Sequence, residues 1–463
     1  MSRIVPETFA VENQINLFFH NHKLGDLLRQ SNIRKDKGVS LDTLFKFLLT
    51  MGFTGKNLFR LLATPGTPEI PSGIRKDAVY RLLNCVSANW RKFLLLLSTR
   101  VIVQKILPLT DDSTTKVLIA DDTLYPRDRS KKVELLSRVH DHNTNRYHRG
   151  FRMLTLGWSD GNSFIPILFS MLSSAKKENR FAEMRTDLDK RTNGYKRRQE
   201  SLKKAPDVLV ELVKTAIAAG TQASYLLFDS WFATPVTIRR IHALGMHTIG
   251  MLKNSGTRYT FQGDDMTLKE LYNWVRKRPG RAKILASLLV TIGDDDQGNP
   301  VPAKILFVRN RAKKGWLALI STDTTLTDEK IVELYGRRWD IEVFFKMTKS
   351  FLNLAKECQS QYFDALVAHT TVVLCRYILL QLARRTNADP RTLGDLFHAT
   401  CDELKQRTFA DALALLLNLL ERSLNKIAGF TKELMAQLVE QFLAELPFSF
   451  QTRMLLLATP SRN

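Results

Sequence analysis

Four polar side chains of different chemistry recur along one segment, TDEKIVELYGRRWDIEVFFKMTKS, at residues 327–350. On a helix at 100° per residue, one stripe about 60° wide holds all four of them, namely Tyr335, Arg338, Glu342 and Lys349. A carboxylate on such a stripe can hold a divalent metal, and the cations and the hydroxyl can bind phosphate oxygens. The stripe rises about 21 Å, which is the length of several phosphates along a nucleic-acid strand.

Further acidic residues follow two short apolar runs that are typical of buried strands. Asp121 and Asp122 come directly after KVLIA, and Asp229 comes directly after YLLF. Phosphodiester cleavage at neutral pH needs an activated water and cations that neutralise the negative charge on the phosphate oxygens. Two divalent metals held by carboxylates supply both. The sequence therefore predicts a two-metal Mg²⁺ or Mn²⁺ site formed by Glu342, Asp229 and one aspartate of the first pair.

Plainer interpretations of these acids remain open. Asp229 can cap the helix that follows it, and Glu342 can be a surface carboxylate paired with Arg338 or Lys346 at helical spacing. Periodicity does not choose between the two neighbouring aspartates, because alternation would send them to opposite faces and the strand can end before either.

The elements that must position these residues alternate between strands and helices. Thr327 can cap the start of a single helix over residues 327–350, with carboxylates in its first turn. An Asp-Gly-Asn sequence predicts a hairpin turn between two apolar runs. The expected strands are 116–120, 151–159, 164–172, 225–228 and 247–252, with a helix at 235–244 between the last two. A strand-rich block, with strands at 283–292, 303–308 and 316–321, precedes the helix of residues 327–350.

Both ends of the chain have helical periodicity. Residues 1–105 hold 16 Lys and Arg against 7 Asp and Glu. The segment 71–92 can supply a recognition helix with Arg75, Lys76, Tyr80 and Arg81 near its first turns, or it can be part of a helical bundle with a basic surface.

Composition indicates a globular protein with a polyanionic partner. The 463 residues carry a formal net charge of +23 and a pI of about 9.9, which favours nucleic acid. Four separated cysteines without a CxxC pair fit a reducing cytoplasm. The first residues, MSRIVPETFAVENQ, lack the apolar region of a signal peptide, and the apolar run 366–383 contains His369 and Arg376, so it predicts a buried helix rather than a membrane span.

The spacing Tyr, two residues, Arg, three residues, Glu, six residues, Lys resembles the signature helix of the insertion-sequence-four family of DDE transposases. The resemblance implies a ribonuclease-H-like fold and a DDE metal site. Because that family places Thr after its first catalytic Asp, it implies Asp122, Asp229 and Glu342 as catalytic residues and metal ligands. It also implies DNA binding by Tyr335, Arg338 and Lys349. Trp316 stands where some members stack a flipped base, although a place in a strand core is the alternative.

The expected fold class is α/β, with a ribonuclease-H-like core, a β-rich insertion and helical flanks. The expected divisions are a helical DNA-binding domain at 1–110, the core at 111–257, the insertion at 258–322, the signature helix at 323–354 and a helical, dimerising region at 355–463. The resemblance implies cut-and-paste transposition of an insertion sequence by a homodimer that binds terminal inverted repeats and target DNA. It further implies a cytoplasmic, nucleoid-associated bacterial protein without a membrane partner. The alternatives are a ribonuclease-H-like DNA nuclease without strand transfer and a catalytically inactive, domesticated DNA-binding protein.

Overall fold

The structure is a computed structural model that describes residues 14–55, 57–63, 73–141, 144–310 and 315–402, with a few isolated positions between 419 and 445. The larger gaps between the described residues fall in two of the expected divisions. These are residues 1–13, 56 and 64–72 of the expected DNA-binding domain, and most of 403–463 in the expected dimerising region.

The core is a mixed sheet whose strand order confirms the predicted ribonuclease-H-like fold. Three strands are antiparallel neighbours, β4 (Phe164–Leu172), β3 (Arg146–Ser159) and β1 (Val117–Pro126). β5 (Tyr225–Phe228) and β6 (His247–Leu252) then continue the sheet parallel to β1. The apolar runs predicted from the sequence are buried in these strands because helices cover both faces of the sheet.

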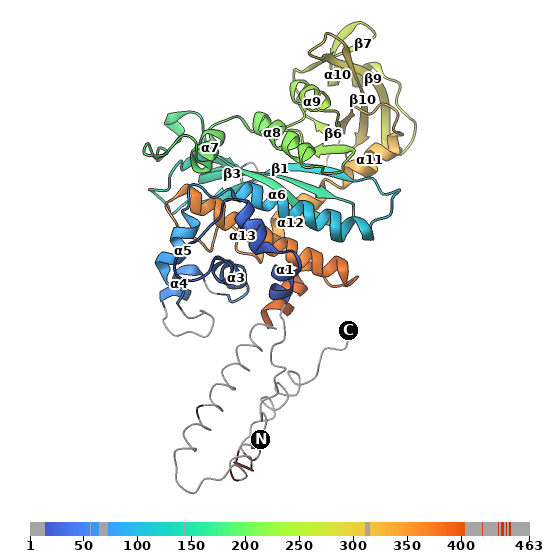
Figure 1. Cartoon of the computed structure of the whole chain (residues 1–463). Coiled ribbons are helices and arrows are strands. Elements are labelled where there is room, and N and C mark those ends of the chain that lie inside the picture. The colour runs from blue at the N-terminus through green and yellow to red at the C-terminus, as the bar shows by residue number, and fades with distance from the viewer. Residues whose placement is uncertain are drawn as a thin grey trace.

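The sheet does not end at β6. A short strand at the other side, β2 (Ser137–Asp141), pairs with the start of β3. Past β6 the order is β11 (Trp316–Ser321), β10 (Pro300–Arg309), β9 (Ile284–Asp294), β7 (Arg258–Phe261) and β8 (Asp264–Thr267). These strands and α10 (Leu268–Trp274) form the upper lobe in Figure 1. Because β11 pairs with β6, the strand-rich block extends the core sheet and does not form a sheet of its own.

Helices cover the two faces of the core in different ways. α8 (Ala205–Ala218) lies against β3 and β4 on one face, followed by α9 (Pro235–His242). On the other face lie α6 (Trp90–Val101), α12 (Trp339–Ser350) and α13 (Phe363–Thr386), as Figure 1 shows. α13 is long and apolar enough to cross a membrane, but its apolar stretch is wholly buried within the protein, as predicted for residues 366–383.

The N-terminal helices share a hydrophobic core with α13. They are α1 (Gln14–Asn21), α2 (Leu24–Gln30), α3 (Leu41–Met51), α4 (Leu58–Ala63) and α5 (Lys76–Leu83). The fully buried Arg376 of α13 donates to the backbone carbonyls of Leu48 and Leu49 and pairs with Glu357 at 2.7 Å. Gly52 is required beside it, because a Cβ there would lie 2.4 Å from the guanidinium.

The expected recognition helix is shorter than the sequence suggests. α5 begins at Lys76, with Arg75 as its N-cap, and ends at Leu83. Lys76 and Arg81 are exposed, whereas Val79 and Leu82 are buried against the bundle. The segment is therefore part of a helical bundle that presents basic residues, and DNA recognition by it stays a prediction.

Candidate active site

Asp121 and Asp229 occupy equivalent positions on neighbouring parallel strands. Ala120 of β1 pairs with Phe228 of β5, so the next residue along each strand is an aspartate. Burial and the nearby charge of Asp229 raise the pKa of Asp121 to about 7. Two carboxylates this close resist ionising together, and a bound cation removes that penalty.

Asp122 faces the other side of the sheet. β1 does not end before the acids, because its pairing with β3 runs from Val117 to Pro126. Regular alternation therefore separates the two aspartates. Asp122 forms an ion pair with Arg152 of β3, which also donates a 2.8 Å hydrogen bond to the His140 carbonyl. The structure brings Asp121 to Asp229 and leaves Asp122 in a pair on the opposite face.

The segment 327–350 forms two helices, which corrects the prediction of one. α11 (Asp328–Gly336) begins at Thr327, whose side chain accepts from the Lys330 amide as predicted, and α12 begins at Trp339. At the junction, the amides of Arg337 and Arg338 bond three residues back instead of four, which tightens the turn. Gly336 is a poor helix former at this point, so the break costs little.

Arg338 lies between two of the carboxylates. Its Nη1 is 3.5 Å from Asp121 Oδ2, and its Nη2 forms an ion pair with Oε1 of Glu342 on the next turn. The guanidinium also lies over the ring of Tyr335, 5.9 Å from its centroid. Burial raises the pKa of Tyr335 to about 12, and the charges of Asp229 and Asp121 contribute. The break between the helices therefore leaves Tyr335, Arg338 and Glu342 together beside the two aspartates.

Lys349 fixes the far end of α12 to the same strand. Its Nζ donates a 2.6 Å hydrogen bond to Oγ1 of Thr123, two residues beyond Asp121 and therefore on the same face of β1. Burial lowers the pKa of Lys349. All four residues of the predicted stripe thus contact β1 or each other.

The donor chemistry fits divalent metal ions. Asp121, Asp229 and Glu342 offer carboxylate oxygens, the ligands that Mg²⁺ and Mn²⁺ prefer. In the part of the chain that the structure describes, no three His, Cys, Asp or Glu side chains are already grouped closely enough to coordinate one ion. Arg338 accounts for this spacing, because its guanidinium contacts both Asp121 and Glu342.

Trp316 lies in an aromatic cluster of the strand-rich block. Its ring stacks on Tyr272 at 5.0 Å and meets the edge of Phe307 at 4.9 Å. These contacts agree with the alternative that Trp316 packs in a strand core. Among the described residues, no contact joins Trp316 to the candidate carboxylates.

Two exposed tryptophans next to the carboxylates were not predicted from the sequence. Trp231 is 54% exposed and its amide donates to Oδ1 of Asp229, and Trp339 is 61% exposed at the start of α12. Both directly neighbour the site along the chain, in the sequences Asp-Ser-Trp and Arg-Trp. That proximity was the available signal, but exposure could not be read from the sequence.

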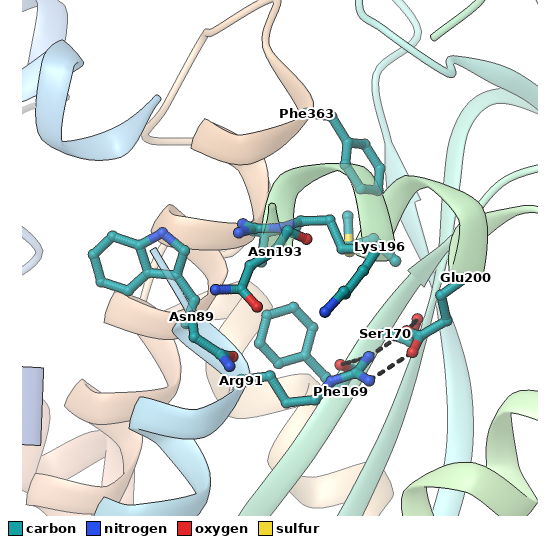
Figure 2. A pocket seen from close by; sticks show the side chains of 12 residues that line it. Asn89, Arg91, Phe169, Ser170, Asn193, Lys196, Glu200 and Phe363 are labelled. Carbon is teal, nitrogen blue, oxygen red and sulfur yellow. Dashed lines mark hydrogen bonds and ion pairs between the residues drawn. The ribbon is translucent and has the colours of Figure 1, made fainter. Parts of the chain in front are cut away.

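A cavity of about 210 Å³ lies elsewhere, between the start of α6, α7 (Asn193–Ser201), β4 and α13 (Figure 2). Arg91 pairs there with Glu200, which also accepts from the Ser170 hydroxyl. None of the predicted site residues lines this cavity. The carboxylates of Asp121 and Asp229 lie instead in the middle of β1 and directly after the end of β5.

Comparison with known proteins gives two family matches. The family described as "DDE superfamily endonuclease" matches residues 28–266, a stretch that contains Asp121 and Asp229. The family described as "Archaeal putative transposase ISC1217" matches residues 190–359, a stretch that contains Asp229 and Glu342. No curated protein matches the chain.

Solved structures resemble the chain only distantly. A piggyBac transposase synaptic complex with hairpin DNA is 12% identical with a TM-score of 0.46, and the match covers 92% of this chain and 84% of that one. The NurA nuclease of Sulfolobus solfataricus is 9% identical with a TM-score of 0.23, over 52% and 80% of the two chains. A Drosophila P element transposase strand transfer complex is 11% identical with a TM-score of 0.22, over 55% of each chain. The fold therefore rests on the strand order above and not on these scores.

Proposed function

The chain belongs to the DDE superfamily of endonucleases, and from this premise we propose that it is a DNA transposase that excises and inserts a mobile element by cutting and joining DNA strands. The observation that carries the proposal is that the Arg338 guanidinium contacts both Asp121 and Glu342, while Asp229 lies beside Asp121. The transposase class is supported by the match of residues 190–359 to a transposase family. The spacing of Tyr335, Arg338, Glu342 and Lys349 supports a place near the insertion-sequence-four transposases.

We propose Asp121, in place of Asp122, as the first metal ligand. Asp122 is held by Arg152 on the opposite face of the sheet, so it would have to leave that ion pair and cross the strand to join Asp229. Asp121 already lies beside Asp229, and its pKa is raised first by burial and then by the charge of Asp229, both of which a bound cation would offset. These contacts of the two aspartates outweigh the family pattern in which Thr follows the catalytic Asp.

In this mechanism the carboxylates of Asp121, Asp229 and Glu342 hold Mg²⁺ or Mn²⁺. When bound, the ions supply an activated water or 3′-hydroxyl and neutralise charge on the scissile phosphate. Arg338 leaves Glu342 for a phosphate oxygen next to the scissile bond, where a charge-assisted bond is strong. Lys349 donates to a phosphate farther along α12, and the Tyr335 hydroxyl donates to a third.

The partners follow from this chemistry. The substrate is DNA, namely the terminal inverted repeats of the element and then the target duplex. The basic N-terminal helices bind the repeats, with the exposed Lys76 and Arg81 of α5 as candidates. Two ends must be brought together before they are joined, so the active form is a homodimer that acts on the nucleoid in a bacterial cytoplasm.

Strand transfer separates this function from its nearest rival, a nuclease of the same fold. A labelled duplex that ends in the element's terminal repeat with a free 3′-hydroxyl is incubated with supercoiled plasmid and Mg²⁺. We expect labelled plasmid with wild type and none with Glu342→Ala. The matched control is Glu333→Ala, which removes an exposed carboxylate of α11 that pairs with Lys330. Cleavage of the repeat without joining would favour the nuclease, and binding without cleavage would favour an inactive DNA-binding protein.

A further inference from the structure

Three exposed aromatic rings, each covered on one face by an arginine, line the β2 side of the sheet. The guanidinium of Arg138 lies 3.8 Å from the ring centroid of Tyr147. The other two pairs are Arg149 over Phe181 at 4.7 Å and Arg185 over Tyr362 at 5.8 Å. The rings are 61%, 46% and 45% exposed in that order, so each has surface available to a ligand. We call these six residues the arginine–aromatic platform: Arg138, Tyr147, Arg149, Phe181, Arg185 and Tyr362.

The platform is built from four segments that hydrogen bonds connect. β2 pairs with β3 so that Arg138 lies directly opposite Arg149. The Phe181 amide donates a 2.7 Å hydrogen bond to the Leu136 carbonyl, which holds that ring beside β2. The buried carboxylate of Glu134 accepts from the amides of Arg185 and Phe363. That carboxylate therefore joins the third pair to the first two.

The foundation of the platform is rigid. Glu134 forms an ion pair with the fully buried Arg198 of α7 at 2.5 Å, and Arg198 also pairs with Asp364 at 2.7 Å. Three charged side chains with mutually satisfied bonds hold α7, α13 and the segment before β2 in one arrangement. The rings above are therefore held in place before any ligand arrives.

The positive charge of the platform favours a polyanionic ligand. Like charges directly opposite each other on a sheet are destabilising, yet Arg138 and Arg149 face each other. Among the described residues neither has a carboxylate partner within ion-pairing distance, and each instead lies over an aromatic ring. Bound phosphates would relieve this repulsion.

The platform lies on the same face of the sheet as the candidate active site. Asp121 pairs with Thr155 of β3, and an even number of residues separates Thr155 from Arg149 and from Tyr147 along an uninterrupted ladder. Eight residues of strand from Thr155 to Tyr147 span roughly 27 Å. A DNA strand that links the carboxylates to the rings would pass outside Met153 and Phe151, which lie between them on this face and are buried.

We propose that the arginine–aromatic platform binds single-stranded DNA, with unpaired bases stacked on the open faces of the rings and phosphates on Arg138 and Arg149, since Arg185 is paired with Asp187. Duplex DNA buries the faces of its bases, so it cannot use such rings, whereas every unpaired base has a face to offer. This assignment rests on the proposed function for the origin of the single strand, which is DNA released next to a cleaved end.

Binding of a fluorescent 20-nucleotide oligo(dT) to the full chain in EDTA tests the platform without catalysis. We expect tighter binding than to an abasic strand of equal length, and a loss of about tenfold or more in Tyr147→Ala and Phe181→Ala. Tyr147→Phe keeps the ring and should retain affinity. Trp274→Ala, which removes an exposed ring of α10 outside the platform, should bind like wild type.

Equal affinity for oligo(dT) and the abasic strand, or unchanged affinity in the Tyr147→Ala/Phe181→Ala double variant, would overturn the proposal. Tighter binding of oligo(rU) than oligo(dT) would overturn the assignment to DNA. Thermal unfolding identifies any variant that fails to fold. In that case, the affinity of Arg138→Gln for oligo(dT) provides the second measurement. Because no metal is present, failure here leaves the cleavage test of the proposed function untouched, and a failed cleavage test leaves this one valid.

Discussion

Nη1 of Arg338 lies 3.5 Å from Oδ2 of Asp121, which joins the start of α12 to the middle of β1 across 217 residues of sequence. The same guanidinium holds Glu342, so one cation neutralises part of the charge of the carboxylate group in the metal-free protein. In the proposed mechanism, metal binding by the carboxylates would release Arg338 to contact DNA.

The two neighbouring aspartates should behave differently when replaced. Asp121→Ala removes a proposed metal ligand, so we expect at least a 100-fold loss of cleavage with normal stability. Asp122→Ala leaves Arg152 without its partner, so we expect a loss of about 1–3 kcal/mol in the free energy of unfolding and retained cleavage. Cleavage rates and urea unfolding measure both effects. Loss of cleavage in Asp122→Ala with retained cleavage in Asp121→Ala would instead identify Asp122 as the ligand.

Arg338 should contribute one phosphate contact to DNA binding. Arg338→Ala is expected to weaken binding of the terminal repeat and to lower the slope of log K against log salt by about 0.9. The neighbouring Arg337→Ala is the control, because Arg337 donates to the Thr115 carbonyl at 2.6 Å and its loss should lower stability and not the slope. An unchanged slope in Arg338→Ala would remove this residue from the DNA contacts.

The exposed tryptophans beside the carboxylates should affect cleavage more than binding. Trp231 and Trp339 present large rings to solvent where a displaced base can stack. We expect Trp339→Ala to reduce cleavage about tenfold and to change repeat binding less than threefold, as measured on the same duplex. Trp274→Ala serves as the control with a similarly exposed ring. Equal cleavage by Trp339→Ala and Trp274→Ala would argue against stacking.

His22 should make the protein sensitive to mild acid. Burial, assisted by the charges of Lys105 and Arg100, lowers the pKa of His22 from 6.5 to about 4. The unfolded chain therefore takes up a proton below pH 6.5 that the folded chain refuses until about pH 4, so stability falls as the pH drops through this window. Between pH 7 and pH 5 the free energy of unfolding falls by about 2 kcal/mol through this group. In urea unfolding, the free energy of unfolding of His22→Gln should fall less between pH 7 and pH 5 than that of wild type, by that amount. The same pH dependence in both proteins would contradict this role of His22.

The sequence was sufficient for most of the local elements around the candidate site. Apolar runs ending in aspartate predict β1 and β5, and the spacing of Arg338 and Glu342 predicts that they share an edge. The choice between Asp121 and Asp122 was beyond reach, because it depends on how far β3 continues its pairing with β1. No local pattern encodes that length.

Long-range packing explains the other differences. The break after Gly336 is stabilised by contacts of Arg337 and Arg338 with β1 and the loop before it, which lie more than 200 residues away. The pairing of β11 with β6 joins the strand-rich block to the core sheet, although each strand was visible in the sequence. The buried contacts of Arg376 with α3 likewise unite regions that the sequence pattern treats as separate.

We propose above that Asp121, Asp229 and Glu342 form one metal-dependent cleavage site. The most direct measurement is cleavage of an end-labelled duplex carrying the element's terminal repeat and flanking DNA, with Mg²⁺ or with EDTA, by wild type and by Asp229→Ala. We predict nicking at the repeat boundary only for wild type with Mg²⁺, while Asp229→Ala still binds the duplex. Cleavage by Asp229→Ala at the wild-type rate, or cleavage by wild type in EDTA, would contradict the account.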